Sequence, residues 1–211
     1  MGLPKIIAIA GKKGAGKTLV ASYLHTRYGY TILNFADELK DLVCDILEIS
    51  REYLEKTKEY CYDIHLEDEH IQMISDKIGT SPKDVLESLQ FKRVFSSPRE
   101  MLQIIGTEVI RQSNPLWHIQ SLNSKIDLID DTKRYCIADM RFENEKEYCK
   151  GALTKTMYIH RNTNTNDKHI SENNLSDCDG FDVVLYNNRD IDALVGNIEV
   201  CIASFQKSLQ N

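Results

Sequence analysis

The stretch that decides the fold of this chain lies near its start and reads Gly11-Lys12-Lys13-Gly14-Ala15-Gly16-Lys17-Thr18. It matches G-x-x-x-x-G-K-[ST], the pattern of a phosphate-binding loop. A short apolar, β-branched run at 5–10 precedes it, as in a strand buried in a parallel sheet. From Thr18 to Tyr28 apolar residues recur at helical spacing, and Gly29 ends the pattern. This order of strand, loop and helix favours a true phosphate loop over a glycine turn followed by a chance Lys-Thr.

Each residue type in the loop has a physical role in binding phosphate. Glycines let the backbone wrap with its N–H groups inward, and the helix beginning near Gly16 adds the positive end of its dipole. Lys17 can reach the β- and γ-phosphates, and the Thr18 hydroxyl can ligate Mg²⁺. We therefore expect ATP to bind along the whole loop, through Gly11, Lys12, Lys13, Gly14, Ala15, Gly16, Lys17 and Thr18.

Composition indicates a soluble globular protein, and 211 residues fit one domain, 1–211. No stretch reaches the roughly 18 apolar residues of a membrane span, and no signal-peptide pattern is visible. We expect no membrane partner and a cytoplasmic location, which for a viral protein is the host cytoplasm. Six scattered cysteines without Cys-x-x-Cys predict free thiols, and the histidines give little support for a metal site.

The charge is unevenly distributed along the chain. The formal net charge of −6 argues against binding to polymeric nucleic acid. Residues 48–87 hold eleven acids and five bases, so the whole net charge falls in this segment and the remainder is neutral. We expect any phosphate-bearing ligand to be held by a few placed cations.

The rest of the chain predicts an α/β fold with a mainly parallel five-stranded sheet and helices on both faces. Further strands are expected at 30–35, 135–139, 156–160 and 182–186, and helices at 37–47, 99–111, around Trp117 and at 190–208. Residues 48–95 are charged, rich in tyrosine and lack a strand pattern, which predicts a helical insertion after the second strand. The wider segment 48–130 is expected to bind the acceptor.

One helix concentrates polar residues on a single side. Projected at 100° per residue, one sector of 99–111 holds two guanidiniums, an amide, a hydroxyl and a glycine, from Arg99, Gln103, Gly106, Thr107 and Arg111. Arginine forks suit a monophosphate and a glutamine suits the edge of a base. Close approach of a ligand or another helix would explain the glycine. A solvated face with a packing glycine is an equally good interpretation of the residues alone.

Two further segments follow predicted strands at their carboxyl ends, where such sheets bind ligands. Asp139 could hold Mg²⁺ beside Thr18, and Arg141 could stabilise the transferring phosphoryl group. A local ion pair between Asp139 and Arg141 is the simpler alternative. The polar segment 161–174, with Arg161 and Lys168, is a candidate lid or a simple surface loop.

The residues at the end of the strand predicted at 135–139 also indicate the class of reaction. The chain has no Asn-Lys-x-Asp guanine reader, and Asp139 is followed by Met140 and Arg141 rather than by the second acid of a motor-type ATPase. An arginine two residues past the acid suits a partner phosphate better than a hydrolytic water. The pattern favours phosphoryl transfer to a small acceptor, with Lys17, Asp139 and Arg141 as the catalytic residues.

A resemblance extends these interpretations. The phosphate loop and the blocks that follow it are similar to the phage-type deoxynucleoside monophosphate kinases, with matches at Phe35–Lys40, Pro98–Gln103, Gly106–Glu108, Arg111, Trp117, Asp139–Glu145 and His169–Glu172. The resemblance covers residues 5–187, and its specific part is Leu-Gln-x-x-Gly-Thr-Glu. The chain departs from that family in its long acidic insertion and in a lid segment that is poor in arginine.

The resemblance implies a P-loop kinase fold, a three-layer α/β sandwich, and Mg²⁺-dependent transfer from ATP to a deoxynucleoside 5′-monophosphate. It also implies the acceptor-binding residues, which are Asp37, Lys40, Arg99, Gln103, Gly106, Thr107, Arg111, Trp117, Arg141 and Glu172. Dephospho-coenzyme A kinase, phosphomevalonate kinase and a non-catalytic nucleotide-binding regulator remain alternatives. The sequence leaves the accepted bases and the formation of a homodimer open.

Overall fold

The computed structural model describes residues 2–151, 153–162, 175 and 178–208. By its internal packing the chain forms two units, each with its own hydrophobic core. Unit 1 comprises Met1–Phe35 and Leu122–Asn211, and unit 2 comprises Ala36–Ser121. The predicted phosphate loop therefore belongs to unit 1, and most of the predicted acceptor residues belong to unit 2.

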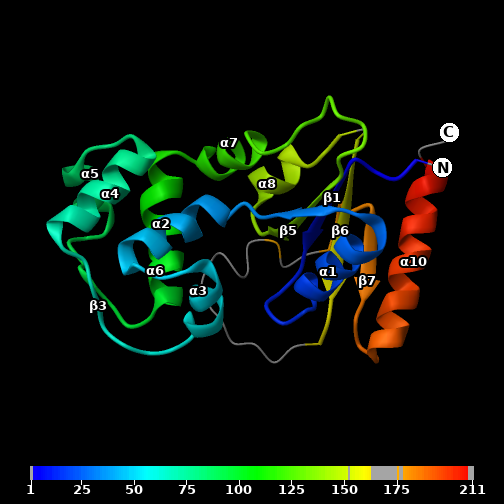
Figure 1. The fold of residues 1–211 in the computed structure, drawn as a ribbon, viewed down its shortest axis with the longest axis horizontal. Helices are drawn as coiled ribbons and strands as arrows, with labels where there is room; N and C mark the ends of the chain where they lie inside the picture. The colour runs from blue at the N-terminus through cyan, green and yellow to red at the C-terminus, as the bar shows by residue number, and fades with distance from the viewer. Residues whose placement is uncertain (1, 152, 163–174, 176–177, 209–211) are drawn as a thin grey trace. The chain divides into compact units, whose positions relative to one another are not determined.

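A parallel five-stranded sheet forms the centre of unit 1 (Figure 1). Its strands are β1 (Ile6–Ala10), β2 (Thr31–Leu33), β5 (Tyr135–Met140), β6 (Thr154–His160) and β7 (Val183–Tyr186), in the order β2-β5-β1-β6-β7. Every neighbouring pair is parallel. All five strands predicted from the sequence are confirmed. The crossover connections place β1, with the phosphate loop at its end, in the middle of the sheet.

The described helices of unit 1 include α1 (Lys17–Tyr28), α8 (Glu143–Tyr148) and α10 (Ile191–Ser208). Apolar packing holds α1 and α10 against the sheet. Ile7 and Ile9 of β1 pack in one buried cluster with Leu24 of α1 and Ile198 of α10. All five residues of β1 are buried, so the sheet is covered on both faces at its central strand, as its continuous apolar run predicts.

Unit 2 is mainly helical. Its helices are α2 (Asp37–Leu47), α3 (Arg51–Thr57), α4 (Asp68–Ile78), α5 (Pro82–Ser88), α6 (Pro98–Ile104) and the π-helix η1 (Ile105–Arg111). The boundary after Ser121 falls within α7 (Trp117–Asn123). One apolar face of α2 (Leu39, Leu42, Val43 and Ile46) is buried in a core that includes Met101 and Ile105. The helical insertion after the second strand is therefore confirmed.

The structure differs from the expectations at three places. Residues 48–95 do contain strand, because β3 (Ile64–His65) pairs antiparallel with β4 (Val94–Phe95); two-residue strands are too short to show an alternating pattern. Helix α8, with the sequence Glu-Asn-Glu-Lys-Glu-Tyr, was missed because it lacks an apolar stripe. The helix expected at 99–111 is confirmed, but past Ile104 it continues as a π-helix.

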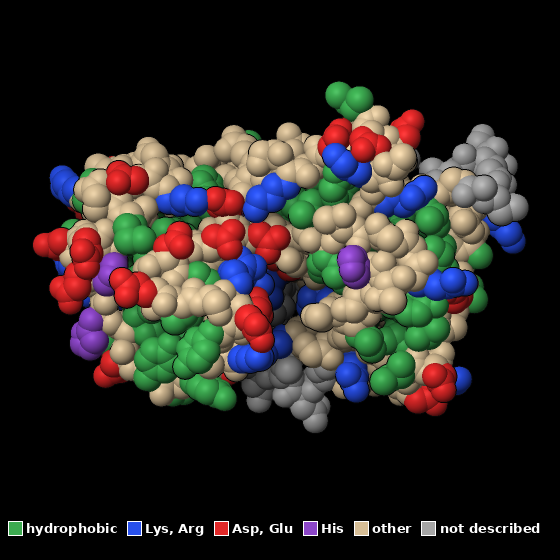
Figure 2. Space-filling view, in the orientation of Figure 1, with side chains coloured by type: hydrophobic (Ala, Val, Ile, Leu, Met, Phe, Trp, Pro, Cys, Tyr) green, Lys and Arg blue, Asp and Glu red, His purple; other side chains and the backbone are tan. Residues whose placement is uncertain are grey.

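Charges in unit 2 are extensively paired. Figure 2 shows acidic and basic side chains next to each other on its visible face, and ion pairs join Lys77 to Glu38, Lys56 to Glu52, Lys92 to Glu100 and Arg93 to Asp68. All six cysteines lie among the described residues and are free thiols, as predicted. In the described part of the chain, no helix combines the length and apolar character needed to cross a membrane.

Candidate active site

The phosphate loop connects β1 to α1 with the backbone shape that its glycines permit. Gly11 and Gly16 have φ angles of +143° and +105°, a region that L side chains rarely adopt. Space is equally restrictive, because a Cβ on Gly11 would lie 2.5 Å from the carbonyl oxygen of Ile159. A Cβ on Gly16 would lie 2.5 Å from Nδ2 of Asn187. Both positions therefore require glycine for conformation and for close packing.

Lys17, the first residue of α1, directs its side chain back over the loop. Its Nζ donates to the carbonyl oxygen of Gly11 at 2.5 Å and to that of Lys12 at 3.0 Å. The backbone N–H of Ala15 donates to the same Lys12 oxygen at 3.1 Å, which closes the loop. The ammonium thus lies within the curve of the loop, where the motif binds phosphate. Thr18 is exposed in the first turn of the helix.

The sheet brings three other predicted residues to the same edge. Ala10, the last residue of β1, pairs with Met140 of β5 and with Tyr158 of β6. Asp139 and Arg141 flank Met140, and Arg161 directly follows β6. Arg161 also donates to the carbonyl oxygen of Gly14, with 3.4 Å between Nη1 and the oxygen. The ends of β5 and β6 therefore frame the phosphate loop, as expected for a parallel sheet.

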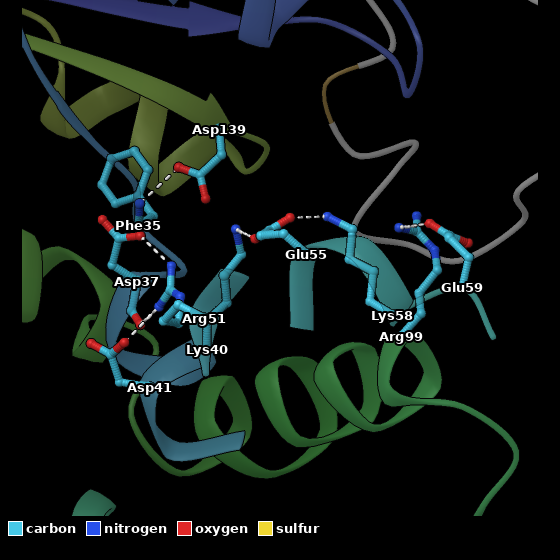
Figure 3. A network of polar contacts seen from close by, with 10 residues as sticks. All are labelled: Phe35, Asp37, Lys40, Asp41, Arg51, Glu55, Lys58, Glu59, Arg99 and Asp139. Carbon is cyan, nitrogen blue, oxygen red and sulfur yellow. Dashed lines mark hydrogen bonds and ion pairs between the residues drawn. The ribbon is translucent and has the colours of Figure 1, made fainter. Parts of the chain in front are cut away.

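Hydrogen bonds within unit 1 orient this edge. The backbone N–H of Phe35 donates to Oδ1 of Asp139 at 2.7 Å (Figure 3), which orients the carboxylate. Glu145 is 1% exposed and its Oε2 accepts the backbone N–H groups of Arg141 at 2.7 Å and Phe142 at 3.1 Å. Glu145 thus fixes the backbone from which Arg141 leaves the sheet. Its supporting role was missed, although an acid three residues after a helix N-cap is a recognisable capping signal.

Unit 2 contains a second group of predicted residues, arranged around carboxylates of α3 and the residues after it (Figure 3). Nζ of Lys40 lies 2.6 Å from Glu55, and Nη1 of Arg99 lies 3.2 Å from Oε1 of Glu59. Lys58, which the sequence did not single out, lies 2.5 Å from the other oxygen of Glu55. Its carbonyl oxygen accepts the backbone N–H of Arg99 at 2.9 Å. Three cations of this unit thus share two carboxylates.

The electrostatic state of Glu55 follows from these contacts. Burial by itself raises the pKa of its carboxyl group, but hydrogen bonds from Lys40 and Lys58, with their charges, outweigh burial and lower the pKa to about 2. Glu55 is therefore an anion near neutral pH. Nearby, Arg51 binds Asp37 at 3.0 Å and Asp41 at 2.7 Å, so the predicted residue Asp37 joins α2 to α3.

The helix predicted at 99–111, which carries the polar sector, does not keep a rotation of 100° per residue over its whole length. Because π-helical turns are wider, with i→i+5 bonds, the rotation of 100° per residue does not apply beyond Ile104. Nε2 of Gln103 is buried and has no hydrogen-bond partner among the described residues. A Cβ on Gly106 would lie 2.7 Å from Cδ2 of Leu39, so close packing of α2 accounts for this glycine. Thr107 and Arg111 are half-buried in η1.

The remaining predicted residues lie in two places. Trp117 is half-buried, packs against the core of unit 2 and has its ring 5.0 Å from that of His118. Lys168 and Glu172 lie outside the described residues, as does most of the expected lid at 161–174.

Asn187 is a further residue for which the sequence predicted no role. It is a polar residue directly after a strand of this sheet, and that position is a signal that could have identified it.

A five-stranded parallel sheet whose central strand leads through a glycine loop into a helix defines a P-loop protein of the α/β class. The family model of deoxynucleotide monophosphate kinase matches residues 42–198. Because this match covers well over half of the chain, the protein belongs to that family. It is therefore a nucleotide kinase, a phosphotransferase, and the resemblance found in its motifs is confirmed.

Individual proteins are also similar to this chain. A protein of Acanthamoeba polyphaga mimivirus, provisionally named a deoxynucleotide monophosphate kinase, is 29% identical in an alignment that covers 93% of this chain and 95% of that protein. Two solved structures are similar with a TM-score of 0.45 each. TT1252 from Thermus thermophilus has 17% identity, with 96% of this chain and 98% of that one covered. The dephospho-CoA kinase from Campylobacter jejuni has 12% identity, with 97% and 98% covered. Similarity at this level does not contribute to the assignment.

Proposed function

We propose that the protein transfers the γ-phosphoryl group of ATP to a deoxynucleoside 5′-monophosphate. The observation that carries the proposal is the position of the Lys17 ammonium within the phosphate loop, in a chain of this kinase family. An oxygen of the acceptor phosphate attacks the γ-phosphorus, and the bond from that phosphorus to the β–γ bridging oxygen breaks. The products are ADP and the deoxynucleoside diphosphate.

This reaction needs little proton transfer. The acceptor phosphate is already an anion near neutral pH, so no strong general base is required. Charge neutralisation and positioning supply the rate. We assign the first task to Lys17, which replaces its bonds to the loop carbonyls with bonds to the β- and γ-phosphates. Arg141, on the backbone fixed by Glu145, neutralises charge on the transferring group.

The residues of unit 1 fit a magnesium ion. Thr18 offers a hydroxyl at the exposed first turn of α1, and Asp139 offers a carboxylate on the strand next to β1. Hard oxygen donors of this kind suit Mg²⁺. Bound there, the ion would neutralise charge on the β- and γ-phosphates. The hydrogen bond from Phe35 keeps the Asp139 side chain oriented.

We assign the acceptor phosphate to Lys40, Arg99, Arg111 and Arg141. Lys40 and Arg99 are paired with Glu55 and Glu59 in the structure, so the incoming phosphate exchanges with these carboxylates. It offers more oxygen atoms and a higher charge than either carboxylate alone. Until the substrate binds, Glu55 and Glu59 keep Lys40 and Arg99 neutralised and ordered.

We assign recognition of the acceptor's base to Gln103. Its buried Nε2 has no partner among the described residues, and a buried donor without a partner is costly. A ring carbonyl or ring nitrogen of the base would satisfy it. The other family positions, Asp37, Gly106, Thr107, Trp117 and Glu172, complete the proposed acceptor site, and Arg161 and Lys168 the proposed lid.

A coupled assay of ADP formation tests the proposal directly. Purified protein is mixed with Mg·ATP and, in turn, with dGMP, dTMP, dCMP, dAMP and their ribonucleotide counterparts. We expect ADP formation that depends on at least one deoxynucleoside monophosphate, with the diphosphate as the second product. ATP binding without ADP formation on any monophosphate would contradict the proposal and indicate a nucleotide-binding regulator. Activity with dephospho-coenzyme A or phosphomevalonate alone would contradict the acceptor class.

A further inference from the structure

Asn187 directly follows β7 and belongs to the small group of buried polar residues in the described chain. Its side chain and backbone are 7% exposed. The side-chain Nδ2 donates to the carbonyl oxygen of Ala15 at 2.8 Å, and the backbone N–H donates to the carbonyl oxygen of His160 at 2.8 Å. One residue thus joins the phosphate loop to the ends of β6 and β7.

The same amide defines the start of α1. Gly16 is the N-cap residue of this helix, and a Cβ there would lie 2.5 Å from Nδ2 of Asn187. The amide is therefore packed against the backbone that directly precedes Lys17 and Thr18. Any shift of the amide is transmitted to the first turn of α1, because the contact leaves no intervening space.

The choice of an amide at this position has a physical reason. The carbonyl oxygen of Ala15 accepts a hydrogen bond from a buried side chain, and a buried acceptor that lacks a donor lowers the stability of the fold. A lysine or arginine could donate too, but it would add a buried charge without a partner. An aspartate would set a carboxylate against the carbonyl and against any phosphate in the loop. A neutral donor of this length satisfies the carbonyl without changing the charge of the loop.

We propose that Asn187 is a positioning residue for ATP, which fixes the turn at Ala15 and Gly16 and so aligns the first turn of α1. This inference rests on the proposed use of ATP by the phosphate loop. Asn187 acts through the loop backbone and contacts no reacting atom. Its removal therefore weakens the interaction with ATP and leaves the interaction with the acceptor unchanged.

The test uses Asn187→Asp, which keeps the size and removes the donor, and Asn187→Ser, which is too short to reach the carbonyl. ATP affinity is measured by calorimetry, and the KM values for ATP and for the monophosphate are measured separately. We expect the Kd and KM for ATP to rise about tenfold or more, with the acceptor KM within about twofold of wild type. Asn187→Asp should have the larger effect because it adds repulsion.

The matched control is Asn197→Ala. Asn197 also donates its side-chain Nδ2 to a backbone carbonyl at the end of β7, that of Tyr186 at 3.3 Å, but it lies on α10 and is exposed. This variant should keep both KM values. A folded Asn187→Asp or Asn187→Ser protein with wild-type ATP affinity would overturn the inference. An equal loss of affinity for ATP and acceptor would overturn it too, because it would indicate a general structural role.

A measurement on the wild-type protein covers the case in which neither variant folds. The side-chain amide signal of Asn187 is followed by nuclear magnetic resonance during titration with Mg·ATP and, separately, with the monophosphate. We expect ATP to shift this signal and the monophosphate alone to leave it in place; no shift with ATP contradicts the inference. Wild-type protein that fails to bind ATP in calorimetry overturns the proposed function itself, so the two failures are distinguishable.

Discussion

Lys40 of α2 binds Glu55 of α3, with 2.6 Å between Nζ and Oε1, and Glu55 binds Lys58 through its other oxygen. A carboxylate is thus held between the ammonium group of Lys40, which we assign to the acceptor site, and that of Lys58. Under the proposed function an incoming phosphate competes with this carboxylate, so the strength of the internal pairs should set part of the acceptor's apparent affinity.

Replacement of Glu55 by glutamine should lower the acceptor KM. The neutral amide binds Lys40 and Lys58 more weakly, so an incoming phosphate meets less competition, and we expect a decrease of roughly threefold to tenfold. Steady-state kinetics with the monophosphate varied at saturating ATP checks this. Glu52→Gln, which breaks the exposed pair with Lys56, is the control. An increase in KM would show that Glu55 instead orders the lysines for binding.

The same carboxyl group predicts a pH dependence of stability. The folded-state pKa of Glu55 is about 2, below the ordinary value of 4.5. A depressed pKa contributes stability that is present above the ordinary value and is lost as the pH falls towards the folded pKa. The difference in melting temperature between wild type and Glu55→Gln should therefore be constant above about pH 5 and shrink towards pH 2. A difference that persists unchanged at pH 2 would exclude this ionic contribution.

Lys17→Ala should abolish phosphoryl transfer while the fold persists. The ammonium contacts the backbone oxygens of Gly11 and Lys12, which belong to the phosphate loop. We expect kcat to fall by roughly a thousandfold or more, as for loss of a preorganised charge at a phosphoryl group. Circular dichroism and the coupled assay measure fold and rate together. Lys56→Ala, at an exposed pair, is the control, and near-native turnover of Lys17→Ala would refute the assignment of the loop.

Two glycines in helical segments should respond to alanine in opposite directions. On α10, a Cβ on Gly196 meets nothing within 4 Å, so Gly196→Ala should stabilise the protein by about 0.5–1 kcal/mol. In η1, a Cβ on Gly106 meets buried Leu39 at 2.7 Å, and Gly106→Ala should destabilise by about 1–2 kcal/mol. Chemical denaturation measures both. Equal stabilisation would show that α2 yields easily at Leu39.

Gln103→Leu should separate stability from recognition. The substitution removes a buried amide nitrogen that has no partner among the described residues, so the free energy of unfolding should stay equal or rise. Recognition of the base should weaken, with the acceptor kcat/KM falling about tenfold or more and the differences between bases shrinking. Denaturation and the coupled assay with four deoxynucleotides test this. Unchanged discrimination would remove Gln103 from the base site.

Much of unit 1 could be predicted because its signals are local in the sequence. The run at 5–10, the glycine loop and the helical spacing up to Tyr28 each need only neighbouring residues, and β1 and α1 formed as expected. The meeting of Asp139, Arg141 and Arg161 at one edge also followed, because parallel strands bring their carboxyl ends together. The short pair of β3 and β4 carries no such periodic signal and was missed.

The sequence by itself determined the class of protein, because a phosphate loop between a buried strand and a helix needs particular residue types at fixed spacing. Only the tertiary structure decided which side chains contact one another between different elements. Lys40 with Glu55, Leu39 against Gly106 and Asn187 against Ala15 join residues that are separated in the chain. Their pairing depends on how helices and strands pack, and packing is set by the whole core rather than by any local pattern.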